Sequence, residues 1–105
     1  MIEKNIHIPR RELEALCEKW YIKTLELFGS VTREDFSKDS DVDVLITFEP
    51  GKTPSWEIVD LKEELEALFN RRVDLLTRPS IERSENRFRK AAILGSAKVI
   101  YERAA

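Results

Sequence analysis

The 105-residue sequence predicts one α/β domain in which a mixed β-sheet is flanked by helices. Two observations lead to this prediction. Segments with the periodicity of amphipathic helices alternate along the chain with short apolar runs that are typical of strands. No internal repeat, low-complexity tract or linker interrupts them, so residues 1–105 are expected to fold as a single domain.

The expected elements follow one another in a regular order. They are a helix over residues 9–21, a strand over 23–28, a short helix over 30–36, a strand over 41–48, a long helix over 53–70, a strand over 72–77, a basic helix over 80–94 and a strand over 97–101. This alternation is what a sheet with helices on its faces requires.

The first helix is indicated by Leu13, Leu16, Cys17 and Trp20, whose spacing places them on one helical face. Pro9 suits the first helical position, because its missing N–H would have no partner there. We therefore expect Cys17 to belong to the core.

The next strand ends at Gly29. Ser30 is then expected to cap a short helix that continues to Phe36, with its hydroxyl accepting a hydrogen bond from a free N–H of the first turn. Apolar side chains at every second position predict the strand over residues 41–48.

Prolines and glycines mark the elements of the C-terminal half. Pro54 is placed at the start of the long helix, whose leucines recur at helical spacing. Pro79 is expected to stop the third strand, and Gly95 to end the basic helix that follows.

Composition describes a highly charged globular chain, with 42% hydrophobic and 36% charged residues and a formal net charge of −2. No apolar run is long enough to cross a bilayer, and the N-terminal residues lack the apolar region of a secretory signal. One cysteine cannot form an intrachain disulfide, so a reducing cytoplasm is the expected location. The mild acidity argues against direct nucleic-acid binding.

Positive charge is concentrated between residues 71 and 90. The basic residues there are Arg71, Arg72, Arg78, Arg83, Arg87, Arg89 and Lys90, opposed by Asp74, Glu82 and Glu85. One interpretation is a solvated helix face held by salt bridges. The other is a surface that attracts nucleotide phosphates or docks an acidic partner.

Two carboxylates, Asp41 and Asp43, open the strand over residues 41–48. Because strand side chains alternate, both point to the same face and raise each other's pKa unless a cation neutralises them. Carboxylate oxygens of this kind suit Mg²⁺. An isolated Asp-x-Asp is usually a surface feature, but the apolar residues around this pair predict a buried strand.

A third acid, Asp74, lies inside a later apolar strand, where acids are depleted. It can be an ordinary strand residue paired with Arg71 or Arg72. If its strand neighbours the one that carries Asp41 and Asp43, three carboxylates instead converge. Such a cluster can hold one or two cations for phosphoryl or nucleotidyl transfer.

Gly29 and Ser30 precede the acidic pair by ten residues. Glycine permits close backbone approach, and free N–H groups at the start of a helix favour an anion. Arg33, one turn further on, can give a phosphate oxygen bidentate contacts. Alone, the dipeptide would be an ordinary capped turn, but together with the carboxylates it predicts a phosphate-binding turn that faces a metal site.

The Gly-Ser pair, the ten residues after it, the Asp-Val-Asp segment and the later strand aspartate resemble the nucleotidyltransferase fold of DNA polymerase beta. More narrowly, the short chain and the segments LFGS, SDVDVLI and RRVDLLT look like the minimal nucleotidyltransferases. In prokaryotes these often serve as antitoxins to HEPN-domain toxins. The resemblance covers residues 9–101 and implies a polymerase beta-like domain with a mixed β-sheet flanked by helices.

The resemblance also implies roles for single residues. Asp41, Asp43 and Asp74 would be the catalytic carboxylates and would hold one or two Mg²⁺ ions. The expected nucleotide-binding residues are Gly29, Ser30, Arg33 and Ser40. The implied reaction passes AMP from ATP to a hydroxyl group, and the implied acceptor is a tyrosine of a partner HEPN toxin.

One position departs from the family pattern, since Glu34 follows Arg33 where glycine is common. A glutamate there could crowd or repel a triphosphate. An alternative function is therefore a non-catalytic antitoxin that neutralises its partner by docking. Transfer to a small molecule is a weaker alternative, because such enzymes usually need a second domain for the acceptor. The oligomeric state, homo- or hetero-oligomer, stays open.

Two other side chains bear on the chemistry. His7 is the only histidine and has no metal-ligand neighbour, so it is expected at the surface. Trp56 is expected either to line the nucleotide pocket or to pack against the domain.

Overall fold

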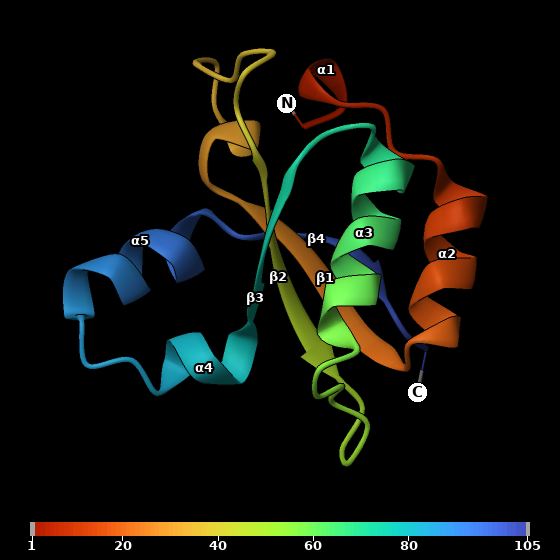
Figure 1. Ribbon diagram of the computed structural model, residues 1–105. Coiled ribbons are helices and arrows are strands. Elements are labelled where there is room, and N and C mark those ends of the chain that lie inside the picture. Colours follow the sequence, from red (N-terminus) through yellow and green to blue (C-terminus); the bar gives the residue numbers. More distant parts are fainter. Residues whose placement is uncertain (1, 105) are drawn as a thin grey trace.

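A computed structural model describes residues 2–104 as a four-stranded mixed sheet with helices on both faces (Figure 1). The strands are β1 (Ile22–Phe28), β2 (Val42–Phe48), β3 (Val73–Thr77) and β4 (Lys98–Glu102), in the spatial order β3-β2-β1-β4. β1 is antiparallel to both β2 and β4, whereas β2 and β3 are parallel. The expected α/β architecture is confirmed.

The helical elements divide between the two faces of the sheet. They are α1 (Ile2–Asn5), α2 (Arg10–Lys19), the 3₁₀ turn η1 (Gly29–Thr32), α3 (Ile58–Phe69), α4 (Arg78–Glu82) and α5 (Arg87–Ser96). α2 and α3 cover one face, and α4 and α5 lie on the other (Figure 1). The sequence patterns did not predict α1.

The larger hydrophobic cluster lies between the sheet and helices α2 and α3, and it includes Leu13 and Cys17 as their spacing predicted. A smaller cluster on the other face joins Leu45 of β2 to Ile81 of α4 and Ile93 of α5. β2 is therefore buried on both faces. This burial positions the start of β2, where the acidic pair lies, firmly between its two neighbouring strands.

The prediction of a helix over residues 30–36 is wrong. The chain forms only η1, in which Phe28 occupies the N-cap position and Ser30 lies inside the turn. The Thr32 hydroxyl donates a hydrogen bond to the Gly29 carbonyl (2.6 Å), which closes the turn on itself. The backbone is extended again at Arg33, so the helix cannot continue.

The long helix begins at Ile58, later than predicted from Pro54. The Glu57 side chain accepts a hydrogen bond from the Ser55 N–H (3.1 Å) and holds the preceding residues in a turn. Trp56 lies in this connection with 76% of its surface exposed. Because the connection leaves the C-terminal end of β2, Trp56 neither lines the site nor packs into the core, and both expectations for it are wrong.

The single basic helix predicted over residues 80–94 is two helices. Pro79 lies at the start of α4, directly after β3, and does not separate the two elements. The Asn86 side chain accepts a hydrogen bond from the Arg89 N–H (3.0 Å), which caps a new helix, α5. Gly95 lies inside α5 and does not end it.

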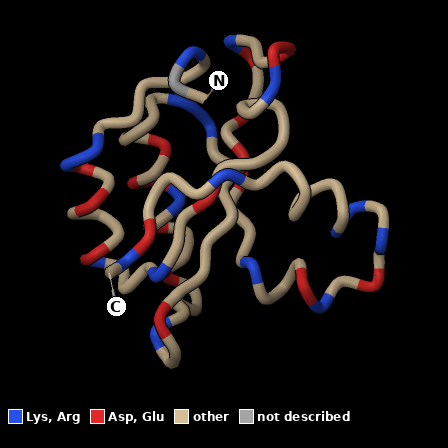
Figure 2. Tube along the Cα trace, turned by 180° about the vertical axis from the view of Figure 1, so that it is seen from behind, with Lys and Arg blue, Asp and Glu red and all other residues tan. Residues whose placement is uncertain are grey.

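We call residues 78–96, which comprise α4 and α5, the arm. In both views the arm projects to one side of the sheet (Figures 1 and 2), and it packs against the sheet through Ile81 and Ile93. At its start, Arg78 donates to the buried Glu26 carboxylate of β1 (2.7 Å). Within residues 2–104 no helix has both the length and the apolar character needed to span a membrane.

Candidate active site

Strand pairing brings the sequence-predicted residues to one end of the sheet. Asp43 lies opposite Phe28 of β1 and opposite Asp74 of β3. Gly29 directly follows Phe28, and Asp41 directly precedes β2. The Gly-Ser turn and the three carboxylates therefore meet around the N-terminal end of β2, although they are far apart in the sequence.

Gly29 is in direct contact with the carboxylate. Its φ of +73° lies in the left-handed region, which glycine adopts without strain. A Cβ atom added at this position would overlap Oδ2 of Asp43. Only a residue without a side chain lets the turn pass this close to the acid, which is the physical reason for glycine here.

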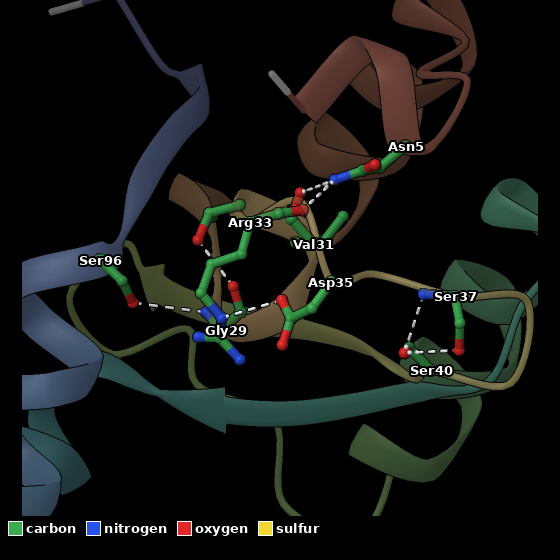
Figure 3. Close-up of polar contacts among 9 residues, drawn as sticks. Asn5, Gly29, Val31, Arg33, Asp35, Ser37, Ser40 and Ser96 are labelled. Atoms are coloured by element: carbon green, nitrogen blue, oxygen red, sulfur yellow. Dashed lines mark hydrogen bonds and ion pairs between the residues drawn. The ribbon is translucent and has the colours of Figure 1, made fainter.

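Two distant residues hold the turn from opposite sides (Figure 3). The Gly29 N–H donates a hydrogen bond to the hydroxyl of Ser96, the last residue of α5 (3.3 Å). The Asn5 amide of α1 donates to the carbonyls of Val31 (2.7 Å) and Arg33 (2.9 Å). Hydrogen bonds from both ends of the chain thus set the path of η1.

The electrostatic environment of Asp43 is unfavourable to its charged form. Burial raises the pKa of its carboxyl to about 6, and the neighbouring Asp74 and Asp41 carboxylates add to the increase, while Arg33 opposes it. A carboxylate in these surroundings gains stability from a bound cation, because the cation favours the ionised form.

Asp41 also has an unsatisfied atom. Its Oδ1 is buried and accepts no hydrogen bond, although the Nε of Arg72 lies 3.0 Å away as an ion-pair partner. The ion pair has a short distance without hydrogen-bond geometry. Asp74 is exposed and forms no ion pair within residues 2–104, so the alternative pairing with Arg71 or Arg72 is not observed.

These acids fit an open Mg²⁺ site, in which the protein supplies only part of the ligands, and not a site that protein side chains enclose completely. In the described part of the chain, no group of three or more acidic, His or Cys side chains stands close enough to enclose a metal by itself. Mg²⁺ usually takes only one or two carboxylates and completes its shell with water and substrate phosphates. The Asp41 oxygen that accepts no hydrogen bond and the disfavoured charge of Asp43 match that open arrangement.

The remaining predicted residues lie beside the turn or further along the loop, and Figure 3 shows Arg33 and Ser40 in these two places. Arg33 lies beside the turn, where its Nε forms an exposed ion pair with Asp35 (3.1 Å). Ser30 is half-buried in η1. Ser40 lies further along the loop, where its hydroxyl accepts from the Ser37 N–H (3.2 Å). The roles of Arg33, Ser30 and Ser40 in nucleotide binding stay predictions, as does the effect of the exposed Glu34.

Sequence reasoning missed three residues of this region: Asn5, Arg72 as the partner of Asp41, and Ser96. Arg72 directly precedes β3, so its position beside the acidic pair follows once β2 and β3 are known to be neighbours. Asn5 and Ser96 carry no local signal, because their contacts with the turn depend on how α1 and α5 dock.

A glycine turn packed against strand carboxylates, on a mixed sheet with helices on both faces, is the arrangement that the resemblance to nucleotidyltransferases implies. Residues 10–100 match the nucleotidyltransferase domain family, and the chain belongs to this family. The resemblance to minimal nucleotidyltransferases is thereby confirmed, and the chain is classed as an enzyme with its relatives.

Individual relatives support this assignment. The protein adenylyltransferase MntA of Thermococcus cleftensis is 37% identical over 82 residues, which are 77% of this chain and 78% of that protein. A chain in the crystal structure of a toxin–antitoxin with AMP-PNP gives a TM-score of 0.67 at 14% identity, over 90% of this chain and 74% of that one.

A further structure contains a tri-AMPylated HEPN toxin from Shewanella oneidensis in complex with an MNT antitoxin. It gives a TM-score of 0.60 at 16% identity and covers 98% of this chain and 74% of that one. At these identities the two solved structures establish a shared fold.

Proposed function

We propose that this chain transfers AMP from ATP to a tyrosine hydroxyl of a HEPN-domain toxin and thereby acts as its antitoxin. The observation that carries the proposal is the contact of the Gly29 turn with Asp43, in register with Asp74. The similarity to the protein adenylyltransferase MntA supports AMP transfer to a protein, and the similarity to an MNT antitoxin in complex with a tri-AMPylated HEPN toxin supports the choice of acceptor.

The turn supplies the phosphate-binding groups. The Ser30 hydroxyl has no hydrogen-bond partner within residues 2–104, so it is available to a phosphate oxygen. Arg33 is exposed beside the turn and can turn its guanidinium from Asp35 to a phosphate, to which it can give a bidentate contact. These groups orient the α-phosphate relative to the carboxylates.

Asp41 and Asp43 would hold Mg²⁺ together with substrate phosphates, and Asp74 would lie beside them. The bound ion would supply positive charge that stabilises the triphosphate during transfer. Asp74 is the most accessible of the three acids, since it is exposed on the edge strand β3. It is therefore placed to take the proton of an incoming acceptor hydroxyl.

The reaction balances without a further reactant. The acceptor oxygen forms a bond to the α-phosphorus of ATP, and the bond from this phosphorus to the bridging oxygen of the β-phosphate breaks. Pyrophosphate leaves with that electron pair, while the hydroxyl proton passes to a carboxylate and then to water. Most of the catalytic effect comes from positioning and charge neutralisation.

The test is label transfer from ATP carrying its label on either the α- or the γ-phosphate. The protein is incubated with Mg²⁺, ATP and the HEPN-domain protein of its own genome. We expect label on the partner from the α-phosphate only, and none with Asp43→Ala. Asp39→Ala, which removes an exposed carboxylate from the nearby loop, is the matched control and should retain transfer.

The other outcomes separate the alternatives. Label from the γ-phosphate would identify a kinase and contradict the proposal. A stable complex that acquires no label would favour the non-catalytic antitoxin. Full transfer by Asp43→Ala would show that the chemistry takes place elsewhere.

A further inference from the structure

The structure divides the basic residues between positions 71 and 90 into two sets. The first set is bound internally: Arg71 to the Ser37 and Ser40 carbonyls, Arg72 to Asp41, Arg78 to Glu26 and Glu82, and Lys90 to the Glu82 carbonyl. The second set comprises Arg83, Arg87 and Arg89. Their side chains form no ion pair or hydrogen bond within the described residues, and all three are exposed.

Phe88 lies between Arg87 and Arg89 and has 91% of its surface exposed, more than any other large hydrophobic residue in the part of the chain that is described. We call Arg83, Arg87, Phe88 and Arg89 the arm tip. Phenylalanine and arginine are among the residue types enriched at protein interfaces, and arginine is one of those that contribute most to the binding energy.

The arm tip is also tied mechanically to the active site. Arg78 anchors the start of the arm to Glu26 of β1, and Ser96 at its end accepts the hydrogen bond from Gly29. α5 has ten residues, so its far end lies about 15 Å from the turn along the helix axis. A protein bound at the arm tip is thus within reach of the carboxylates.

We propose that the arm tip docks an acidic face of the acceptor protein, in which carboxylates surround an apolar socket that receives Phe88. The proposal rests on the proposed function, since the docked protein is the one whose hydroxyl enters the site. Charge complementarity selects this occupant: three guanidinium groups without internal partners require carboxylates, and the aromatic side chain between them requires an apolar contact.

This choice of partner is also favoured by the charge of the whole chain. The formal net charge is −2, and the exposed arginines Arg83, Arg87 and Arg89, which have no partner within the described residues, all lie on the arm. Figure 2 shows that the basic positions along the arm are interrupted by acidic ones. A protein that binds nucleic acid usually presents a continuous basic stripe.

The experiment measures binding of the HEPN-domain protein by biolayer interferometry, together with the KM for that protein and the Kd for ATP. The variants are Phe88→Ala and the double change Arg87→Glu with Arg89→Glu. Both should weaken partner binding and raise the partner KM at least about tenfold, and high salt should weaken wild-type binding. The Kd for ATP should not change.

The matched control is Arg11→Glu, which reverses an exposed arginine on α2, on the opposite face of the sheet. It should bind the partner as the wild type does. Because all the changed side chains are exposed, melting temperatures should stay close to the wild-type value and exclude unfolding as the cause.

Unchanged partner binding by the double variant would overturn the proposal. The proposal would also be overturned if the variants kept partner binding but lost a self-association that the wild type shows. Loss of RNA binding with partner binding intact would overturn it in the same way. Partner binding that depends on the arm tip without any AMP transfer would support docking and reject the proposed function. AMP transfer with an unchanged partner KM in the variants would support the proposed function and reject docking at the arm tip.

Discussion

The Asp43 carboxylate occupies the space that a side chain at position 29 would need, so the Gly29–Ser30 turn and the acidic pair are in direct contact through Gly29. Gly29 also has a positive φ, as does Gly51, which has no atoms around the place of its absent Cβ. The two glycines therefore share a positive φ, but only at Gly29 would an added Cβ meet another side chain.

Gly29→Ala and Gly51→Ala form a matched pair of variants. Comparing them separates the effect of backbone strain at positive φ from the effect of a Cβ that meets Asp43. Each should lose about 1–2 kcal/mol of unfolding free energy because alanine is strained in the left-handed region. Only Gly29→Ala should lose AMP transfer, because its Cβ displaces Asp43. Urea unfolding and α-phosphate label transfer measure the two effects. Equal activity in both variants would show that the contact is not required.

Asp43→Asn should stabilise the metal-free protein at neutral pH while abolishing transfer. The folded-state pKa of Asp43 is about 6 against an ordinary value of 3.8, so the folded protein binds this proton more tightly than the unfolded chain does. Stability from this group is therefore lost as pH rises through that interval, and the loss is complete above it. Asparagine cannot ionise, so the variant does not lose this stability as pH rises.

Urea midpoints for the wild type and Asp43→Asn, measured from about pH 4 to pH 7, check this sign. The urea midpoint of the variant should rise relative to that of the wild type as pH rises. Mg²⁺ should reduce this difference in midpoint, because it favours the ionised carboxylate of the wild type. Asp39→Asn is the control and should show no such trend. A variant that is least stable at neutral pH would contradict the prediction.

Ser96 should act as a positioning residue for the turn. Ser96→Ala removes the acceptor of the Gly29 N–H, and we expect ATP binding to weaken about fivefold, as loss of one hydrogen bond of about 1 kcal/mol implies. Ser96→Thr keeps the hydroxyl and should restore affinity. ATP titration with Mg²⁺ gives the measurement, and partner affinity should be the same in all three proteins. If Ser96→Thr and Ser96→Ala weakened ATP binding equally, the hydroxyl of Ser96 would not be what positions the turn.

Arg78→Ala should destabilise the protein far more than Arg83→Ala. The first change leaves the buried Glu26 carboxylate without its partner, at an expected cost of about 2 kcal/mol or more. Arg83 is exposed and its side chain has no partner within residues 2–104, so its removal should cost little. Thermal unfolding of the two variants measures the difference, and similar melting temperatures would show that the pair does not anchor the arm.

Local patterns in the sequence predicted most of the sheet and the helices that cover one face. The spacing of Leu13 and Cys17 is a property of a single helix, and the alternation around Asp43 is a property of a single strand. Such patterns depend on near neighbours, so they can be interpreted without knowledge of the fold. The residue types of the Gly-Ser pair and the acids likewise indicated phosphate and metal chemistry.

The predictions failed where side chains compete for backbone groups. Thr32 closes η1 after one turn, and Asn86 caps a new helix where continuous helical periodicity predicted one basic helix. A side chain that hydrogen-bonds the backbone can interrupt a helix whose apolar spacing is otherwise suitable. Hydrophobic periodicity does not register these local contacts.

The sequence by itself thus determined which side chains are available for nucleotide chemistry and which segments carry them. The tertiary structure alone decided that Asp74 lies in register with Asp43 and that Asn5 and Ser96 hold the turn. It also decided which arginines are used internally and which remain free at the arm tip. These relations join residues far apart in the chain, and they follow from strand order and helix docking, which no local spacing encodes.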